Sequence, residues 1–272
     1  MGAPPVVRRE PFRPFRVAWL FFRVGIMSEL QYRVNFFLQV LQSVVALGTG
    51  LVVLSIVFSH TTELAGWSRP QLLVLMGIHI MMGGGIHTFV QPNMERLMED
   101  VRKGTLDFVL TKPEDAQVVV SVREIRLWQT VDILLGAAVL TVALVQLRGG
   151  VGPWQALRFG LALLLGAIML YCFWLIISVG VFWIIRLEWV GNLFDGIYAT
   201  GRWPIGIYPV GLRASLTFLV PVAFAVTIPA QALTGRLTSA NLAIAAVFAM
   251  ALSAFTRWFW KRGLRRYSGA SA

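Results

Sequence analysis

Apolar residues gather in six long stretches along the chain, and short polar or charged segments separate them. These stretches run from Phe36 to Phe58, Gln71 to Gln91, Gln129 to Leu147, Leu157 to Ile185, Gly206 to Ile228 and Asn241 to Trp260. A helix needs roughly 20 apolar residues to cross a hydrocarbon core of about 30 Å. The pattern therefore predicts an all-α integral membrane protein with six spans. The fifth span is the weakest, because Pro209, Pro221 and Pro229 interrupt it.

Composition and the distribution of charge support this prediction and orient the chain. The 272 residues are 57% hydrophobic and 14% charged, with a net charge of +11, which is too apolar for a typical soluble domain. If the N-terminus is cytoplasmic, twenty of the 24 Lys and Arg, including Arg202 and Arg213, fall in inner segments. The positive-inside rule then places both termini in the cytoplasm. Because the basic residues flank apolar spans, we expect them to meet lipid and no nucleic acid.

The segment before the first span has an amphipathic pattern of its own. Phe15, Trp19, Phe22 and Ile26 recur near helical spacing, which predicts an interfacial helix on the inner membrane surface. The alternative is a plain basic tail that only fixes topology. We accordingly divide the chain into a cytoplasmic N-terminus (1–34), a six-span domain (35–262) and a cytoplasmic tail (263–272). The stretch 187–205 could be a loop, an interfacial helix or part of the fifth span.

A charged island, Met94 to Gln129, lies in the cytoplasmic loop 93–128 between the second and third stretches. Pro92 and Asn93 are expected to end one helix and cap another. An apolar stripe at i, i+3, i+4 and i+7 follows, and Gly104 has the position of a helix C-cap. The stripe consists of Met94, Leu97, Met98 and Val101. A second short element, carrying Leu106, Val109 and Leu110, ends at Pro113. The pattern predicts two short amphipathic helices hinged at Gly104.

Four short motifs follow one another along this chain. They are Val101-Arg102-x-Gly104-x-Leu106-Asp107-x-x-Leu110-x-x-Pro113, Tyr32-Arg33-x-Asn35-Phe36, Gly66-Trp67-Ser68 and Gly201-Arg202-Trp203-Pro204. With the span count and loop lengths, they resemble the permease subunits of bacterial ABC transporters of the type 2 exporter class, in a six-span branch of about this length. The resemblance covers nearly the whole chain.

This resemblance implies a function, partners and a location. The chain would be a multi-pass permease of the bacterial inner membrane, paired with an identical or sister permease and driven by two nucleotide-binding ATPase subunits. The loop after the second span would be a coupling helix that docks on an ATPase. Its docking residues would be Met94, Leu97, Met98, Val101, Arg102, Lys103, Gly104, Leu106, Asp107 and Pro113. The alternative is a solvated loop whose charges only enforce topology.

Catalytic and cofactor signals are missing from the sequence. No Gly-x-x-x-x-Gly-Lys-[Ser/Thr] loop occurs, so we expect ATP and Mg²⁺ to bind only to a partner ATPase and the chain itself to be no enzyme. His79 and His87 are poorly spaced for a metal site, and none is expected. Asp132 is expected to pair with Arg126 or Arg213. A cavity lined by the first, second and fifth spans would export a hydrophobic or amphipathic substrate; an ATP-independent carrier and a membrane scaffold are the alternatives.

Overall fold

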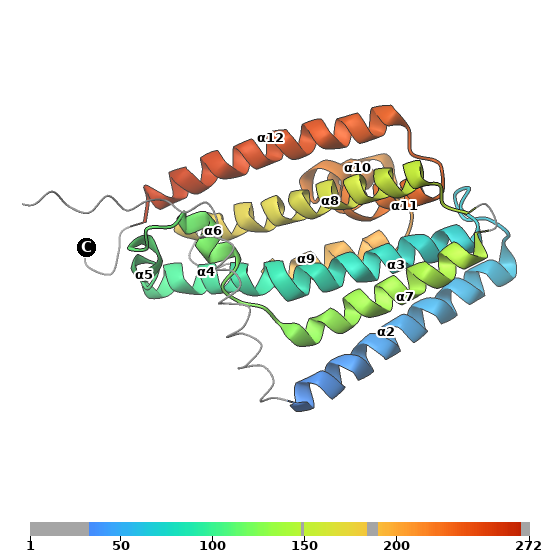
Figure 1. Ribbon diagram of the computed structural model, residues 1–272, viewed down its shortest axis with the longest axis horizontal. Coiled ribbons are helices and arrows are strands. Elements are labelled where there is room, and N and C mark those ends of the chain that lie inside the picture. The colour runs from blue at the N-terminus through green and yellow to red at the C-terminus, as the bar shows by residue number, and fades with distance from the viewer. Residues whose placement is uncertain (1–32, 148–149, 184–189, 268–272) are drawn as a thin grey trace, which may run out of the picture.

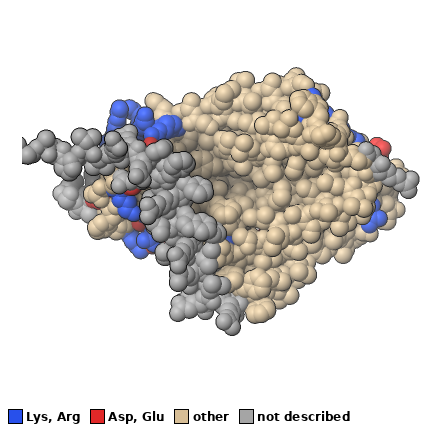
Figure 2. Space-filling view, in the orientation of Figure 1, with Lys and Arg blue, Asp and Glu red and all other residues tan. Residues whose placement is uncertain are grey.

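The computed structural model describes residues 33–147, 150–183 and 190–267 and forms an elongated helical bundle (Figure 1). Its long helices are α2 (Arg33–His60), α3 (Arg69–Gly85), α7 (Thr130–Gln146), α8 (Pro153–Val179) and α12 (Ser239–Leu264). Among the residues that the structure describes, five helical runs are long and apolar enough to cross a membrane, or six if one bent pair counts as a span. The predicted all-α membrane fold is confirmed. Charged side chains on the visible face gather at the two ends of the bundle, and the middle is almost entirely uncharged (Figure 2).

The second span continues into the charged island without a break, so the predicted helix end at Pro92 is wrong. A π-helical turn, η1 (Ile86–Val90), joins α3 to α4 (Gln91–Lys103), giving a helical run of 35 residues. Proline has no N–H, so Pro92 cannot donate to the carbonyl of Thr88 one turn earlier. The backbone N–H of Arg126 donates to that carbonyl instead, at 3.1 Å. Because Arg126 supplies the hydrogen bond that Pro92 cannot donate, the helix continues through the proline.

Close backbone contact joins α3 to α7, its most extensive partner. A Cβ on Gly136 of α7 would lie 2.4 Å from the backbone nitrogen of Met81, and one on Gly77 of α3 would lie 2.8 Å from the nitrogen of Leu140. Small residues allow two helices in a membrane to approach this closely. Packing between the helices is a main cause of their association in lipid. By contrast, α2 contacts the bundle chiefly through α7 and is only 11% buried over its most apolar window.

The fifth apolar stretch is not one straight helix. It forms α10 (Val210–Ala214) with η6 (Ser215–Leu219), and then η7 (Ala223–Thr227) with α11 (Ile228–Leu233); the two halves meet at 79°. Pro221 lies in the break and Pro229 in the first turn of α11, where the missing N–H costs least. The second half packs on α8, since a Cβ on Gly166 would lie 2.6 Å from the Cα of Ala225.

The segment before this bent pair also enters the bundle. It comprises α9 (Val190–Tyr198), η4 (Ala199–Arg202) and η5 (Ile205–Ile207). Gly191 lies against Gln91 at the start of α4, whereas Gly201 lies against His79 in α3 and Val222 at the bend. Between Gly191 and Gly201, the segment α9–η4 therefore runs alongside the helical run of α3 and α4, from the level of Gln91 to that of His79. Arg202, which the charge count placed in an inner loop, lies at the depth of His79; that placement is corrected.

Short helices complete the end of the bundle that contains α4. They are α5 (Asp107–Leu110), α6 (Ala116–Ser121), η2 (Leu127–Gln129) before α7, and η3 (Gly180–Phe182) after α8. Gly104 has φ +70° and ends α4 as predicted. Its left-handed conformation turns the chain from α4 into α5.

Candidate functional site

Two features of the structure are candidates for function: the projection formed by α4, α5 and α6 at one end of the bundle, and a cavity within the bundle. In the projection, Met94, Leu97 and Leu106 are fully buried in the chain's own core. Met98, Val101 and Asp107 are half-buried, while Arg102, Lys103 and Pro113 are exposed. A partner can therefore reach only part of the predicted docking set. Phe15, Trp19, Phe22 and Ile26 of the predicted interfacial helix lie outside the described residues.

The most exposed apolar side chain of the projection was missed by the sequence interpretation. Phe108 in α5 is 76% exposed, and Leu110 is 37% exposed beside it. Both follow Leu106, whose burial fixes the orientation of α5. An amphipathic pattern over only four residues does not show which side faces the core, so the sequence carried little signal for Phe108.

Buried polar contacts hold the projection rigid. Asn93 donates from Nδ2 to the carbonyls of Phe89 and Glu124, and its Oδ1 accepts from the backbone N–H groups of Arg123 and Glu124 at 2.7 and 2.9 Å. The buried carboxylate of Asp100 accepts from the Arg123 guanidinium at 2.6 Å. These bonds connect α4 to the segment that leads into α7. Asn93 therefore links two segments of the chain and is not the predicted helix cap.

A charged pair anchors the projection to α12. Asp115 caps α6 by accepting from the N–H of Gln117 at 2.9 Å and is also paired with the guanidinium of Arg257. The hydrogen bond from Arg257 is the main reason that the pKa of Asp115 lies below its usual range. A carboxylate that accepts bonds from both a cation and a helix N-terminus is stabilised in its charged form. The pair therefore joins α12 to α6 at neutral pH.

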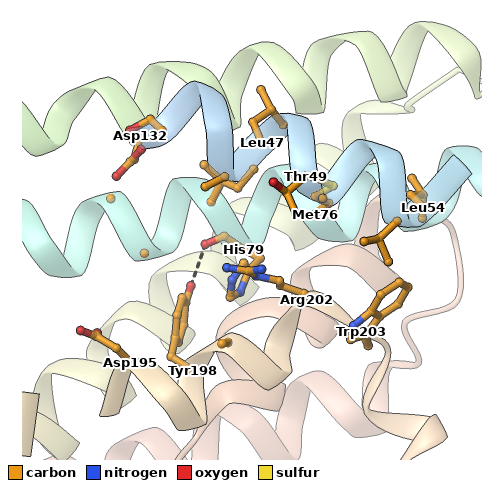
Figure 3. Close-up of a pocket in the computed structure, with 18 of the residues that line it drawn as sticks. Leu47, Thr49, Leu54, Met76, His79, Asp132, Asp195, Tyr198, Arg202 and Trp203 are labelled. Atoms are coloured by element: carbon orange, nitrogen blue, oxygen red, sulfur yellow. Dashed lines mark hydrogen bonds between the residues drawn. The ribbon is translucent and has the colours of Figure 1, made fainter. Parts of the chain in front are cut away.

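The cavity, of about 420 Å³, lies between α2, α3 and the α9–η4 segment (Figure 3). Its lining includes Leu54, Met76 and Trp203, and most of it is apolar. Polar groups also line it: His79, His87, Asp132, Asp195 and Arg202. Its walls come from the first and second apolar stretches and from the segment just before the fifth, which the charge pattern had assigned to an inner loop.

Two of the cavity's carboxylates have partners in the chain. Asp132 accepts from the Nε2 of Gln39 at 3.2 Å, so the expected pairing with Arg126 or Arg213 is wrong. Arg126 instead pairs with Glu95, and Arg213 donates to two backbone carbonyls. Asp195 lies 3.7 Å from the Nε2 of His87. Both carboxylates lie toward the end of α3 that continues into α4.

A stacked aromatic pair lies deeper in the cavity. The rings of His79 and Tyr198 are 4.5 Å apart and nearly parallel, and the Tyr198 hydroxyl donates to the His79 carbonyl at 2.8 Å. Arg202 lies beside His79, near enough for its charge to act on the imidazole (Figure 3). The sequence motif around Arg202 was noted, but residues 190–202 are too short and too polar to be recognised as entering the bundle.

A chain of side-chain contacts joins the cavity to the projection. His87 Nδ1 lies 2.5 Å from the Oε1 of Gln91, whose Nε2 donates to Glu95 at 2.8 Å. Glu95 in turn accepts from Arg126 at 2.6 Å. Because the amide nitrogen of Gln91 faces a carboxylate, its oxygen faces His87, and the Nδ1 of His87 is therefore the donor. His87, Gln91 and Glu95 follow i, i+4 spacing along one helical run, and Arg126 lies in the segment just before η2 and α7.

The structure is a helical bundle with membrane-spanning helices, an internal cavity and a projection at one end, an arrangement that suits a membrane transport component. Comparison with protein families agrees: the family model described as ABC-2 family transporter protein matches residues 44–271. The chain belongs to this family. No curated protein and no solved structure matches the chain.

Proposed function

We propose that this chain is the permease subunit of an ATP-driven exporter in the bacterial inner membrane, with both termini in the cytoplasm. Two ATPase subunits, which would bind the ATP and Mg²⁺, and a second permease, identical or a sister chain, would complete the transporter. The observation that carries the proposal is the uninterrupted helical run Arg69–Lys103. One end of it lines the cavity, and the other end forms the cytoplasmic projection.

This continuity supports a mechanical role. Packing and the Asn93 and Asp100 ties make α4 move together with the segment leading into α7. A push on the projection by an ATPase would therefore be transmitted along α3 to the cavity wall, while α2 has few contacts that oppose its movement. Alternating access means that the cavity opens in turn to each side of the membrane. It would follow from changes in the distances between α2, α3 and α9, which surround the cavity. The largely apolar lining favours a hydrophobic or amphipathic substrate.

Affinity purification of the tagged chain from its native membrane tests the proposal. We expect two ATPase subunits to co-purify, and vanadate-sensitive ATP hydrolysis in the reconstituted complex but not in the chain alone. Gradient-driven uptake by the purified chain alone would support an ATP-independent carrier instead. Isolation of the chain with neither an ATPase nor any transport activity would favour a scaffold.

The site of docking is tested by substituting Phe108. We expect Phe108→Ala to reduce recovery of the ATPase at least about fivefold, because a buried interface phenylalanine contributes on the order of 1 kcal/mol or more. Phe255→Ala is the matched control, since Phe255 is 47% exposed and belongs to α12, outside α4, α5 and α6. Equal recovery of the ATPase with both variants would show that α5 is not the docking element.

A further inference from the structure

Arg202 places a positive charge deep within the bundle. It lies beside His79, about ten residues from the start of α3, which corresponds to roughly 15 Å along a helix. That is about half the thickness of a hydrocarbon core of about 30 Å. Ionisable side chains at this depth are costly and commonly line a substrate path.

The described residues provide little to neutralise this charge. They form no hydrogen bond or ion pair with the Arg202 guanidinium, which lines the cavity in an exposed position. Asp132 touches Gly84, and Asp195 touches His87, about one and a half to two turns farther along the α3 run than His79. Asp132 accepts a hydrogen bond from Gln39, whereas the Oδ1 of Asp195 lies 3.7 Å from the Nε2 of His87 and makes no hydrogen bond within the described residues.

A second polar group beside Arg202 also lacks a partner. His79 is 7% exposed, and its Nδ1 makes no hydrogen bond within the described part of the chain. A buried ring nitrogen without a partner costs free energy unless a ligand or water satisfies it. Apolar side chains near these two polar groups also line the cavity, among them Leu54, Met76 and Trp203 (Figure 3).

We propose that the cavity binds an amphiphile with an anionic oxygen headgroup, a carboxylate or a phosphate, which pairs with the Arg202 guanidinium while its apolar tail lies along Leu54 and Met76. Arginine suits such groups because its planar fork donates two parallel hydrogen bonds to two oxygens. In the cavity, the tail would contact these apolar side chains in place of lipid. This inference rests on the proposed function and names the substrate class of that cavity.

Equilibrium binding to the purified full chain in a neutral detergent tests the inference. The probes are oleate and lysophosphatidylglycerol, with oleyl alcohol as the uncharged match for oleate and inorganic phosphate as an anion without a tail. We expect saturable binding of at least one anionic amphiphile, tighter than that of oleyl alcohol. Oleate alone would identify a carboxylate as the headgroup, and lysophosphatidylglycerol alone would identify a lipid phosphate. Phosphate binding as tightly as either amphiphile would overturn the inference.

Substitutions identify the binding group. Arg202→Gln should weaken binding of the anionic amphiphile about tenfold or more, since a hydrogen bond to a charged group contributes that much. Arg202→Lys, which keeps the charge but not the two parallel hydrogen bonds, should bind the anionic amphiphile more weakly than the native chain and more tightly than Arg202→Gln. Arg262→Gln, which removes an exposed cation at the far end of α12, should change nothing. Oleyl alcohol should bind Arg202→Gln as it binds the native chain, which shows an intact cavity. Unchanged binding of the anionic amphiphile to Arg202→Gln would overturn the inference.

This outcome is separable from that of the proposed function, because binding is measured without an ATPase. Amphiphile binding that depends on Arg202, in a chain that recovers no ATPase, would refute the exporter and leave the site intact. Recovery of an ATPase by a chain whose cavity does not prefer anionic amphiphiles would support the exporter and refute the proposed binding site.

Discussion

Asn93 is a residue whose side chain forms four hydrogen bonds while only 1% of its surface is exposed. Truncating it would leave the backbone N–H groups of Arg123 and Glu124 without partners in a buried setting. We expect Asn93→Ala to lower the free energy of unfolding of the purified chain by about 2–3 kcal/mol, because buried donors left without acceptors are costly. Denaturant or thermal unfolding in detergent measures this.

The matched control for Asn93 is Asn192→Ala on α9, where the side chain is exposed. We expect that variant to unfold within about 0.5 kcal/mol of the native chain. Equal stability of the two alanine variants would contradict the structural role assigned to Asn93.

The sequence could identify Asn93 as polar and significant but not what it binds. An asparagine after a proline commonly starts a helix, and its partners in the segment 123–124 are 30 residues away. The same limit applies to Asp132, whose partner Gln39 lies on another span. Gly104 was predicted correctly because its role depends only on local backbone conformation.

At the scale of elements, Gly136 sets the distance between α7 and α3. A methyl group there would collide with the backbone of Met81, and neither helix backbone can move without disturbing its neighbours. We expect Gly136→Ala to destabilise the chain by about 1–3 kcal/mol, as overpacking does. Gly160→Ala on α8 is the control, because no atom lies within 4 Å of its added Cβ. The fraction of monodisperse chain after extraction, and its thermal midpoint, distinguish the two; an equally stable Gly136→Ala would contradict the close approach.

The contact between α6 and α12 is expected to depend on pH. The pKa of Asp115 is lowered in the folded chain, chiefly by the hydrogen bond from Arg257. The pair therefore stabilises the fold above the ordinary aspartate pKa of about 4, and this contribution is lost as the pH falls through the lower folded value. Asp115→Asn keeps the helix cap but removes the charge.

Since the Asp115 side chain is 42% exposed, Asp115→Asn should lower the free energy of unfolding at pH 7 by no more than about 1 kcal/mol. We expect the difference from the native chain to shrink as the pH is lowered below 4. Glu114→Gln, next in sequence, is the control for a general loss of negative charge. A difference that stays constant from pH 7 to pH 3 would contradict the assignment.

Hydrophobic length predicted most of the membrane elements, because lipid makes span length a physical requirement. The stretches from Phe36 to Phe58 and from Asn241 to Trp260 fall within α2 and α12. The fifth stretch could not be resolved in the same way. Prolines at 209, 221 and 229 fit a kinked span as well as a bent pair, and the sequence shows neither the packing of Ala225 on Gly166 nor the 79° angle between the halves.

For the molecule as a whole, the cavity and the projection share one helical run. Under the proposed function, ligand binding in the cavity and docking of an ATPase on the projection would influence each other equally if both favour the same arrangement of that run. The hydrogen-bonded series from His87 through Gln91 to Glu95 and Arg126 is the polar connection along it. Gln91 is its central member and is buried.

We expect Gln91→Ala to leave recovery of the ATPase unchanged, because Gln91 lies away from exposed α5. The variant should lose most of the stimulation of ATP hydrolysis by oleate or lysophosphatidylglycerol in the reconstituted complex, as a coupling energy of about 1–3 kcal/mol implies. Glu99→Gln is the matched control, since Glu99 contacts Lys103 and Arg96 on the surface of α4 and lies outside the series. Full stimulation in Gln91→Ala would show that the series contributes to stability alone, and that α3 transmits the motion through its backbone and its packing on α7.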